Sequence, residues 1–315
     1  MTRVLVVGGG IVGASIAYHL ADAGAAVTVL FRDAGVTASS FAWIGGTGTG
    51  WPGGAADLRD CVLPDWRRLA EAVPGVGVRW PGSLSWPAPA TVAPGQHLIG
   101  AAETAAREPA LRTVPDTAVH IPGDGAVDAA AAARALLLAA RDRGARLVSG
   151  AETPAVTTPP NEITVLAAGT GVTELSGGRV TVPASPAFLI RLRGPAGLVR
   201  SVVATPHFEV REDHAGHLLA TAPLGRDRTW PGLRALAGDT MQRLRAAFGA
   251  DLRLTGWSVG ERPMPEGGPV IGFLDPSTYV AVMHSAVCLA PAVGRLAAGE
   301  ILTGRPAPEL AGCRR

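Results

Sequence analysis

The order of apolar and polar positions near the start of the chain predicts a strand, a helix and a second strand. Residues 4–7 (VLVV) form a continuous apolar run that is typical of a buried strand, and residues 26–31 (AVTVLF) form another. Between these runs, one face of a predicted helix carries the apolar side chains of Ile11, Ile16, Leu20 and Ala23. The alternation of strands with a helix favours an α/β fold.

The turn between the first strand and the helix contains the glycine pattern GxGxxG, formed by Gly8, Gly10 and Gly13. Gly8 permits a tight turn, Gly10 lets a pyrophosphate approach the backbone, and Gly13 allows the helix to pack closely on the strand. The start of the helix then presents free N–H groups and the positive end of its dipole to the phosphates. The pattern therefore predicts a dinucleotide-binding turn.

The second strand departs from the usual pattern at its end. Such a strand commonly ends in Glu or Asp, whose carboxylate accepts hydrogen bonds from the ribose hydroxyls, but here the position is held by Phe31. Arg32 and Asp33 follow directly, so a shift of one residue could present either side chain. Arg32 also suits a 2′-phosphate, which keeps an NADP-binding site open.

Helix boundaries are also readable further along the chain. Asp128 is suited to cap the helix AAAAARALLLAARDRG, and Gly144 is its expected stop. Residues 278–283 (TYVAVM) predict a strand that leads into the final helix. In that helix we expect Pro291 in the first turn and Gly304 at the end.

Composition and charge exclude several classes of protein. The chain has 315 residues, 47% of them hydrophobic, and a net charge of +2 with no lysine and no basic cluster, which argues against nucleic acid as a partner. Cys61, Cys288 and Cys313 are scattered without metal-ligand spacing, as expected for reduced thiols in a cytoplasmic protein. No run predicts a membrane span, and the apolar residues 4–21 belong to the glycine turn rather than to a signal peptide.

Five segments follow one another in a distinctive order: VLVVGGGIVG, TASSFAWIGG, ITVLAAG, GERPMPEGGPVIG and VAVMHSAVCLAPAVGRLAAGEILTG. In this order they resemble the glycine oxidase and D-amino-acid oxidase (DAO) family of flavoproteins. The resemblance implies an α/β fold in which a glutathione-reductase-like, FAD-binding Rossmann domain is interleaved with a smaller mixed-sheet α+β substrate domain. It assigns residues 1–50, 122–175 and 257–315 to the FAD domain and residues 51–121 and 176–256 to the substrate domain.

The resemblance implies non-covalently bound FAD as the cofactor. Ser39 and Ser40 can donate hydrogen bonds to phosphate oxygens, while Gly45 and Gly46 allow the backbone to lie against a flat ring system. The segment around Ala155 looks like the one on which relatives rest the adenine. Elsewhere the implied contacts of the cofactor are Gly8, Gly10, Ile11, Gly13, Arg32 and Gly169.

At the start of the final helix, the resemblance places backbone N–H groups against the flavin pyrimidine. A positive helix end there stabilises the negative charge of reduced flavin and so favours hydride acceptance. His284 could assist oxygen or substrate, or it could be a structural histidine. The residues expected at this helix end are Ser285, Ala286, Val287, Cys288 and Leu289.

For the substrate, the resemblance points to Arg262 in GERPMPEGGPVIG, because relatives use an arginine in this slot to pair bidentately with a carboxylate. Relatives often carry a substrate-binding tyrosine in the strand that corresponds to PHFEVRED, where Phe208 stands in the slot with His207 beside it. Carboxylate binding is then expected from Arg262 with His207 or water. None of the cysteines matches the slot for covalent flavin attachment.

Together these features predict an FAD-dependent oxidase of a small amino acid or an N-substituted glycine. The substrate is an amine that carries a carboxylate, the α-carbon gives a hydride to flavin N5, and O2 restores the flavin and yields hydrogen peroxide. Two alternatives stay open. Arg32 is compatible with an NADP-dependent oxidoreductase, and the loss of the carboxylate at Phe31 is compatible with a non-catalytic nucleotide-binding protein.

Overall fold

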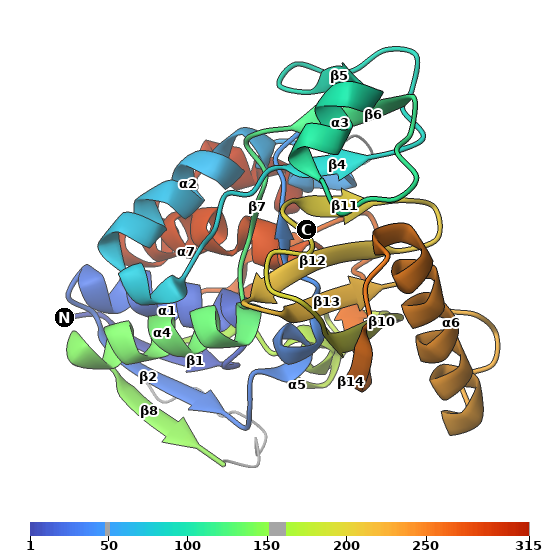
Figure 1. Cartoon of the computed structure of the whole chain (residues 1–315). Helices are drawn as coiled ribbons and strands as arrows, with labels where there is room; N and C mark the ends of the chain where they lie inside the picture. Colours follow the sequence, from blue (N-terminus) through green and yellow to red (C-terminus); the bar gives the residue numbers. More distant parts are fainter. Residues whose placement is uncertain (48–50, 151–161, 315) are drawn as a thin grey trace.

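The computed structural model describes residues 1–47, 51–150 and 162–314. Within these residues the chain forms two large sheets and a short two-stranded one. In Figure 1 the first large sheet and its helices lie on the side of the N-terminus, and the second sheet lies beside them with α6 on its far side. The predicted α/β class, in which the two parts are interleaved along the sequence, is confirmed.

The first sheet is parallel apart from one antiparallel edge strand. Its order is β15-β16-β9-β1-β2-β8, and only β15 runs against its neighbour. Val7 at the end of β1 stands level with Leu30 on β2 and Leu166 on β9, so three strands end at one edge beside the glycine turn. The strands are β1 (Arg3–Val7), β2 (Ala26–Phe31), β8 (Arg146–Ser149), β9 (Glu162–Leu166), β15 (Val270–Asp275) and β16 (Thr278–Val282).

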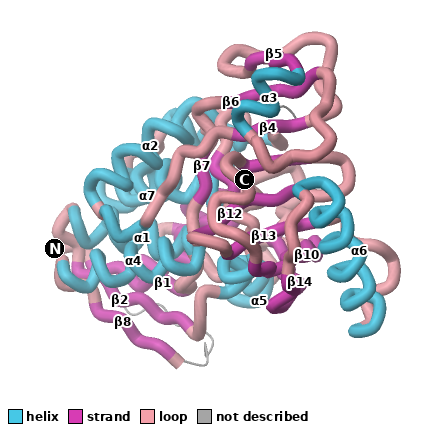
Figure 2. Tube along the Cα trace, viewed as in Figure 1, coloured by secondary structure: helices cyan, strands magenta, loops and turns pink. Residues whose placement is uncertain are grey.

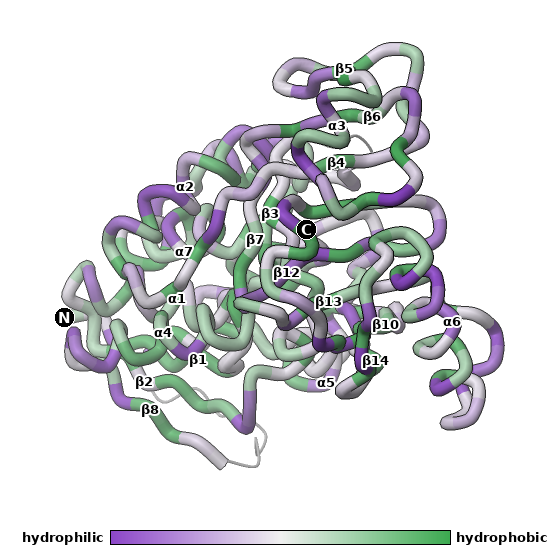
Figure 3. The backbone as a smooth tube through the Cα atoms, in the orientation of Figure 1, coloured by the Kyte–Doolittle hydropathy of each residue, from purple (hydrophilic) through white to green (hydrophobic). Residues whose placement is uncertain are grey.

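A layer of helices packs together against this sheet, and α1 contacts both α4 and α7. Figure 2 shows them side by side over one face of the strands. In Figure 3, β1 and β2 are mainly hydrophobic, whereas α2 and α6 carry hydrophilic stretches toward solvent. The helices of this layer are α1 (Ile11–Asp22), α2 (Arg59–Ala72), α4 (Ala129–Asp142) and α7 (Ala286–Thr303).

Three expected helix ends are confirmed. The Asp128 side chain accepts a hydrogen bond from the N–H of Ala131 at 3.0 Å, which is an N-cap. Gly144 follows α4 with a φ of 94°, and Gly304 closes α7 with a φ of 67°, a left-handed conformation that favours glycine. Local capping chemistry therefore fixes all three ends where the sequence indicates them.

The position of Pro291 differs from the prediction. Because α7 begins at Ala286, Pro291 is its sixth residue and lies beyond the first turn. A proline there lacks the N–H that would bond the carbonyl of Val287. The indole N–H of Trp66 on α2 donates to that carbonyl at 3.0 Å, so a buried side chain replaces the missing helical bond.

α7 has the length and apolar composition of a membrane span, but 61% of it is buried inside the protein. It contacts α1 closely through Gly294, where a Cβ atom would lie 2.1 Å from Ser15 Oγ. Among the helices that the structure describes, no other has both the length and the composition of a span. This packing is that of a core helix.

The second sheet is mixed, with the order β14-β10-β13-β12-β11-β4-β6-β5. Among its strands in the described residues, only β11 and β4 pair in parallel. Its described strands form the mixed sheet that the resemblance implies. Its strands are β4 (Ser83–Ser85), β5 (His97–Gly100), β6 (Thr117–Ile121), β10 (Ala184–Arg193), β11 (Val202–Ala204), β12 (Glu209–His214), β13 (His217–Thr221) and β14 (Arg253–Pro263).

Each face of the second sheet has its own packing partner, because successive side chains of a strand point to opposite faces. Phe188, Ile190 and Val210 pack into a core with α6 (Trp230–Phe248). The opposite face turns toward the first sheet, where Arg191 donates to the carbonyl of Ala38 at 2.8 Å. The remaining elements are α3 (Ala101–Arg107), α5 (Val172–Leu175) and a ribbon of β3 (Trp43–Ile44) and β7 (Gly125–Ala126).

The domain boundaries remain a prediction, and two elements lie differently from it. α2 was assigned to the substrate domain, yet Val62 and Trp66 belong to the core beneath α7. β14 begins before residue 257 and pairs with β10 along its whole length, so the predicted boundary cuts a strand of the second sheet.

Candidate active site

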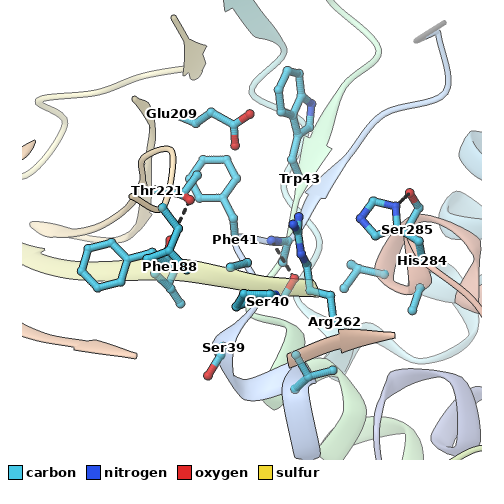
Figure 4. A pocket seen from close by; sticks show the side chains of 18 of the residues that line it. Ser39, Ser40, Phe41, Trp43, Phe188, Glu209, Thr221, Arg262, His284 and Ser285 are labelled. Atoms are coloured by element: carbon cyan, nitrogen blue, oxygen red, sulfur yellow. Dashed lines mark hydrogen bonds between the residues drawn. The ribbon is translucent and has the colours of Figure 1, made fainter. Parts of the chain in front are cut away.

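A cavity of about 510 Å³ lies between the two sheets (Figure 4). Its walls come from the loop after β2, from β10, β12, β13 and the end of β14, and from the start of α7. It adjoins a crevice of about 150 Å³ at the glycine turn, and both are lined by Ile11, Thr37, Met283 and Ala286. The two hollows together form a long site that suits an extended ligand with one end at the glycine turn.

The glycine turn has the geometry that the pattern predicts. Gly8 has a φ of 126°, and a Cβ atom there would lie 2.3 Å from the carbonyl oxygen of Ala167. A Cβ at Gly13 would lie 2.1 Å from the carbonyl oxygen of Gly8. At Gly10 the nearest atom to a Cβ would be Thr37 Oγ1 at 3.1 Å, so this position faces the crevice. The tight turn and the close helix packing are therefore confirmed.

Thr37 is a residue of this crevice that the sequence analysis missed. It is buried, and its Oγ1 accepts a hydrogen bond from the N–H of Ile11 at 3.1 Å. Ile11 is the first residue of α1, so Thr37 satisfies one of the free N–H groups at this helix end. The sequence signal that could have identified Thr37 is its position two residues before the predicted Ser39.

At the end of β2, Phe31 takes the place of the ribose-binding carboxylate. It lines the crevice, and its ring lies against the backbone of Gly9, where a Cβ would meet Phe31 Cβ at 2.7 Å. The Asp33 side chain is hydrogen-bonded within its own turn, because its Oδ1 accepts a hydrogen bond from the N–H of Gly35 at 2.6 Å. Arg32 lines the crevice and is exposed, so it stays the candidate for ribose binding.

The loop after β2 contributes the predicted serines to the cavity. Ser39 and Ser40 line it, and Ser40 Oγ accepts the N–H of Ala42 at 3.1 Å. Gly45 and Gly46 are not part of the described walls. A Cβ at Gly45 would face Asp124 Oδ1 at 3.3 Å, and one at Gly46 would face Leu63 Cγ at 3.3 Å. A side chain at either position would thus point into the protein, and contact of the Gly45 and Gly46 backbone with a ring system stays a prediction.

Two further predicted residues belong to the adenine side of the crevice. Gly169 lines the crevice shortly after the end of β9, and its φ is 60°. Ala155, the expected rest for the adenine, lies outside the described residues.

The start of α7 turns backbone donors toward the cavity. Ala286, Val287 and Cys288 line it, and N–H groups in the first turn have no partner within the helix. The N–H of Leu289 bonds the carbonyl of Ser285 at 3.1 Å, and the residue is fully buried. The prediction that Leu289 also points at a flavin is therefore wrong, because its N–H belongs to the helix.

Two residues with strained backbone conformations line this cavity. Among the described residues, Ala42 and Ser285 are the non-glycine residues with a positive φ, both at 55°. Ala42 lines the cavity from the loop after β2, and Ser285 lines it from the residue before α7. Such conformations cost about 1–3 kcal/mol each and persist where the surrounding structure imposes them, which is common at functional sites.

The second sheet presents Arg262 to the cavity from the end of β14. Arg262 pairs with Ser185 on β10, and its Nη2 donates to Ser185 Oγ at 3.3 Å. In Figure 4 its guanidinium points into the cavity, as do Glu209 and His284. Arg262 therefore lines the cavity, and its role in binding a substrate carboxylate stays a prediction.

The predicted slot Phe208 and its neighbour Glu209 both line the cavity. Phe208 is 7% exposed and also packs in the core with α6, and its correspondence to the family's tyrosine stays a prediction. Glu209 stands in one row with Thr221 on β13 and Leu189 on β10, and all three line the cavity. His207 is exposed and is not part of the described cavity wall. Alternation along β12 was the signal that identifies Glu209.

Burial shifts the titration of three groups in the cavity. The pKa of His284 is lowered, first by burial and then by the positive charge of Arg262, and its Nδ1 lies 3.0 Å from Ser285 Oγ. Burial raises the pKa of Glu209, while Arg262 opposes that shift. Burial also raises the pKa of Cys288 to about 11, and its thiol donates to the carbonyl of Trp43. At neutral pH the histidine is uncharged and the thiol stays protonated.

Comparison with known proteins connects this geometry to a family. A family model described as FAD dependent oxidoreductase (DAO) matches residues 3–300. The structure of glycine oxidase from Bacillus cereus ATCC 14579 is similar with a TM-score of 0.81 at 17% identity, covering 99% of this chain and 98% of that chain. No curated protein sequence matches the chain.

Two further solved structures show the same fold. Glycine oxidase from Geobacillus kaustophilus has a TM-score of 0.81 at 20% identity, covering 100% of this chain and 98% of that chain. Iminodiacetate oxidase from Chelativorans sp. BNC1 has a TM-score of 0.78 at 21% identity, covering 97% of this chain and 96% of that chain.

Proposed function

Because the chain belongs to the DAO family of FAD-dependent oxidoreductases, we propose that it oxidises a small amino acid or an N-substituted glycine. FAD is the family's cofactor, which removes the NADP-dependent and non-catalytic alternatives from further consideration. The observation that carries the choice of substrate is Arg262, a guanidinium directed into the cavity between the sheets.

The described residues fit FAD. Gly10 leaves the crevice open beside the first turn of α1, where backbone N–H groups suit a pyrophosphate. Ser39 and Ser40 lie between this crevice and the larger cavity, and the first turn of α7 supplies donors at the other end. When bound, FAD supplies a two-electron acceptor. We expect it to be held without a covalent bond, because the Cys288 thiol is engaged with the carbonyl of Trp43.

Arg262 would bind the substrate carboxylate. Its Nη2 and Nε contacts to Ser185 are long, at 3.3 and 3.4 Å, so they hold the side chain without consuming its best donors. A guanidinium fork pairs with a carboxylate through two parallel hydrogen bonds, which fixes the orientation of the α-carbon as well as its position. Orienting the α-carbon toward the flavin is the main contribution that this residue makes to the rate.

The reaction needs the substrate amine in its neutral form, since its lone pair assists the departure of the hydride. His284 is uncharged at neutral pH because burial and Arg262 lower its pKa. An uncharged imidazole in the cavity does not repel a cationic substrate, and it can accept a hydrogen bond from the amine. The product is an imine, which water hydrolyses to a carbonyl compound and an amine or ammonia.

We expect O2 to receive the two electrons and, with two protons, to form hydrogen peroxide. The thiols of Cys61, Cys288 and Cys313 are all free, which is consistent with the reducing cytoplasm as the location of the enzyme.

A panel of substrates tests this function. Oxygen uptake and peroxide formation are measured with purified FAD-loaded protein on glycine, D- and L-amino acids and N-alkyl glycines. We expect at least one compound to give equal amounts of peroxide and imine-derived carbonyl product. Flavin that is reduced by a substrate without oxygen uptake would make the protein a dehydrogenase instead, and no reduction by any carboxylate-bearing amine would refute the proposed function.

A further inference from the structure

Glu209 is an acidic group in the wall of the cavity described above. It lies at the start of β12, in one row with Thr221 and Leu189, and its carboxylate is directed into the cavity (Figure 4). The sheet therefore presents a carboxylate and the guanidinium of Arg262 to the same space.

Glu209 is only partly buried, unlike Glu108 and Asp124, and no hydrogen-bond donor to its carboxylate is found among the described residues. Glu108 accepts the N–H groups of Arg200 and Ser201, and Asp124 accepts Trp43 Nε1 at 2.8 Å. These partners are what full burial of a carboxylate ordinarily requires. The carboxylate of Glu209 instead stays open to the cavity, where water or a ligand can donate to it.

Arg262 does not satisfy Glu209 directly. No ion pair joins them within 4.0 Å in the part of the chain that the structure describes, although the positive charge of Arg262 acts on the pKa of Glu209. The two groups thus stand apart as opposite charges on one wall. Charges so arranged favour a ligand with a carboxylate at one place and a cation at another.

The cation that suits Glu209 is not the amine that is oxidised. A carboxylate that accepts hydrogen bonds from an amine favours its protonated form. The protonated amine has no lone pair to assist hydride loss, so such a contact at the reacting nitrogen would slow the reaction. A second, distant ammonium or guanidinium group gains the same interaction without this cost.

We propose that Glu209 selects substrates with a second cationic group, so that the substrate class is an amino acid or N-substituted glycine whose substituent carries an ammonium or guanidinium. The inference rests on the proposed function, because Arg262 fixes the carboxylate end of the same molecule. Glu209 is then a specificity-determining residue, and Arg262 and Glu209 bind opposite ends of the substrate.

The test compares N-(2-aminoethyl)glycine with N-propylglycine, which has the same number of heavy atoms but no second cation. We expect wild-type kcat/KM to favour the cationic compound about tenfold or more, the effect of one charge-assisted hydrogen bond. E209Q should bring the ratio of the two kcat/KM values close to one while the purified variant keeps its FAD. T221V, which changes the neighbouring wall residue without altering charge, is the matched control and should preserve the ratio.

The outcomes separate this proposal from the proposed function. A wild-type ratio near one, or an unchanged ratio in E209Q, overturns the role of Glu209 even though either compound is oxidised. If neither compound is oxidised, the proposal is tested by ligand binding instead. Calorimetry should show that wild type binds 4-aminobutanoate about tenfold more tightly than pentanoate, and that E209Q does not. Equal binding of both acids to wild type overturns the proposal.

Discussion

The glycine turn of the first sheet and the inner face of the second sheet both line the site, but the sequence specifies them in different ways. Gly8 and Gly13 lie within one turn and are required by backbone atoms at 2.3 and 2.1 Å from a hypothetical Cβ. Glu209 and Arg262 lie on different strands, and they share a face only because β12, β13, β10 and β14 pair in a particular register.

This difference shows why one half of the site is easier to predict. A steric requirement within a turn is visible as a glycine pattern. The face that a side chain occupies on a strand changes with each residue, so an assignment displaced by one position exchanges core and cavity. Glu209, one position after the predicted Phe208, was missed for this reason, although both residues line the cavity.

The largest expected effect is that of Gly13→Ala. Its Cβ would lie 2.1 Å from the carbonyl oxygen of Gly8, so the turn and α1 must move apart. We expect the variant to lose FAD or to fail to fold, as measured by the visible spectrum and by circular dichroism. Gly299→Ala is the control, because nothing lies within 4 Å of its Cβ position, and it should keep both FAD and stability. Retention of FAD by Gly13→Ala would contradict the steric account.

Phe208→Ala tests the register of β12. Phe208 is 7% exposed in the core with α6, so its removal should lower the free energy of unfolding by about 3–5 kcal/mol in denaturant titrations. His207→Ala, on the exposed neighbour, should change it by less than about 0.5 kcal/mol. If Phe208→Ala left stability unchanged but impaired substrate binding, the Phe208 ring would serve the cavity wall rather than the core.

Arg262→Ala tests the substrate half of the site. Loss of a bidentate partner should lower kcat/KM about a hundredfold or more, mainly through KM, with FAD still bound. Arg253→Ala removes an exposed arginine at the other end of the same strand and should leave steady-state kinetics unchanged. Unaltered turnover in Arg262→Ala would show that the carboxylate binds elsewhere.

Phe31→Glu has a smaller expected effect, in the opposite direction. A carboxylate at the end of β2 would accept hydrogen bonds from the ribose, worth about 1.5–3 kcal/mol, and should tighten FAD binding about tenfold or more. Phe31→Leu keeps the position apolar and should not tighten it. The comparison is made by titrating each apoprotein with FAD, and equal affinity in both variants would show that the ribose does not reach this position.

Much of the first sheet was predictable because its signals are local. The glycine turn, the Asp128 cap and the closure of α7 at Gly304 each depend on a few neighbouring residues. Local sequence could not show that Trp66 replaces the hydrogen bond that Pro291 removes, because the two lie on different helices.

The cofactor contacts divide along the same line. Ser39, Ser40 and the first turn of α7 line the cavity as expected, whereas Gly45 and Gly46 pack against Asp124 and Leu63. A glycine in the sequence indicates that another group approaches the backbone closely. Only tertiary packing decides whether that group belongs to a ligand or to the protein.

The central claim is that the cavity between the two sheets brings a carboxylate-bearing amine to FAD. Anaerobic titration of the purified holoprotein with N-alkyl glycines, followed by its visible spectrum, tests this most directly. The account predicts that the flavin absorption bleaches in wild type and that Arg262→Ala requires about a hundredfold more amine for the same bleaching. Flavin that stays oxidised in wild type with every such amine, or that bleaches identically in both proteins, would contradict it.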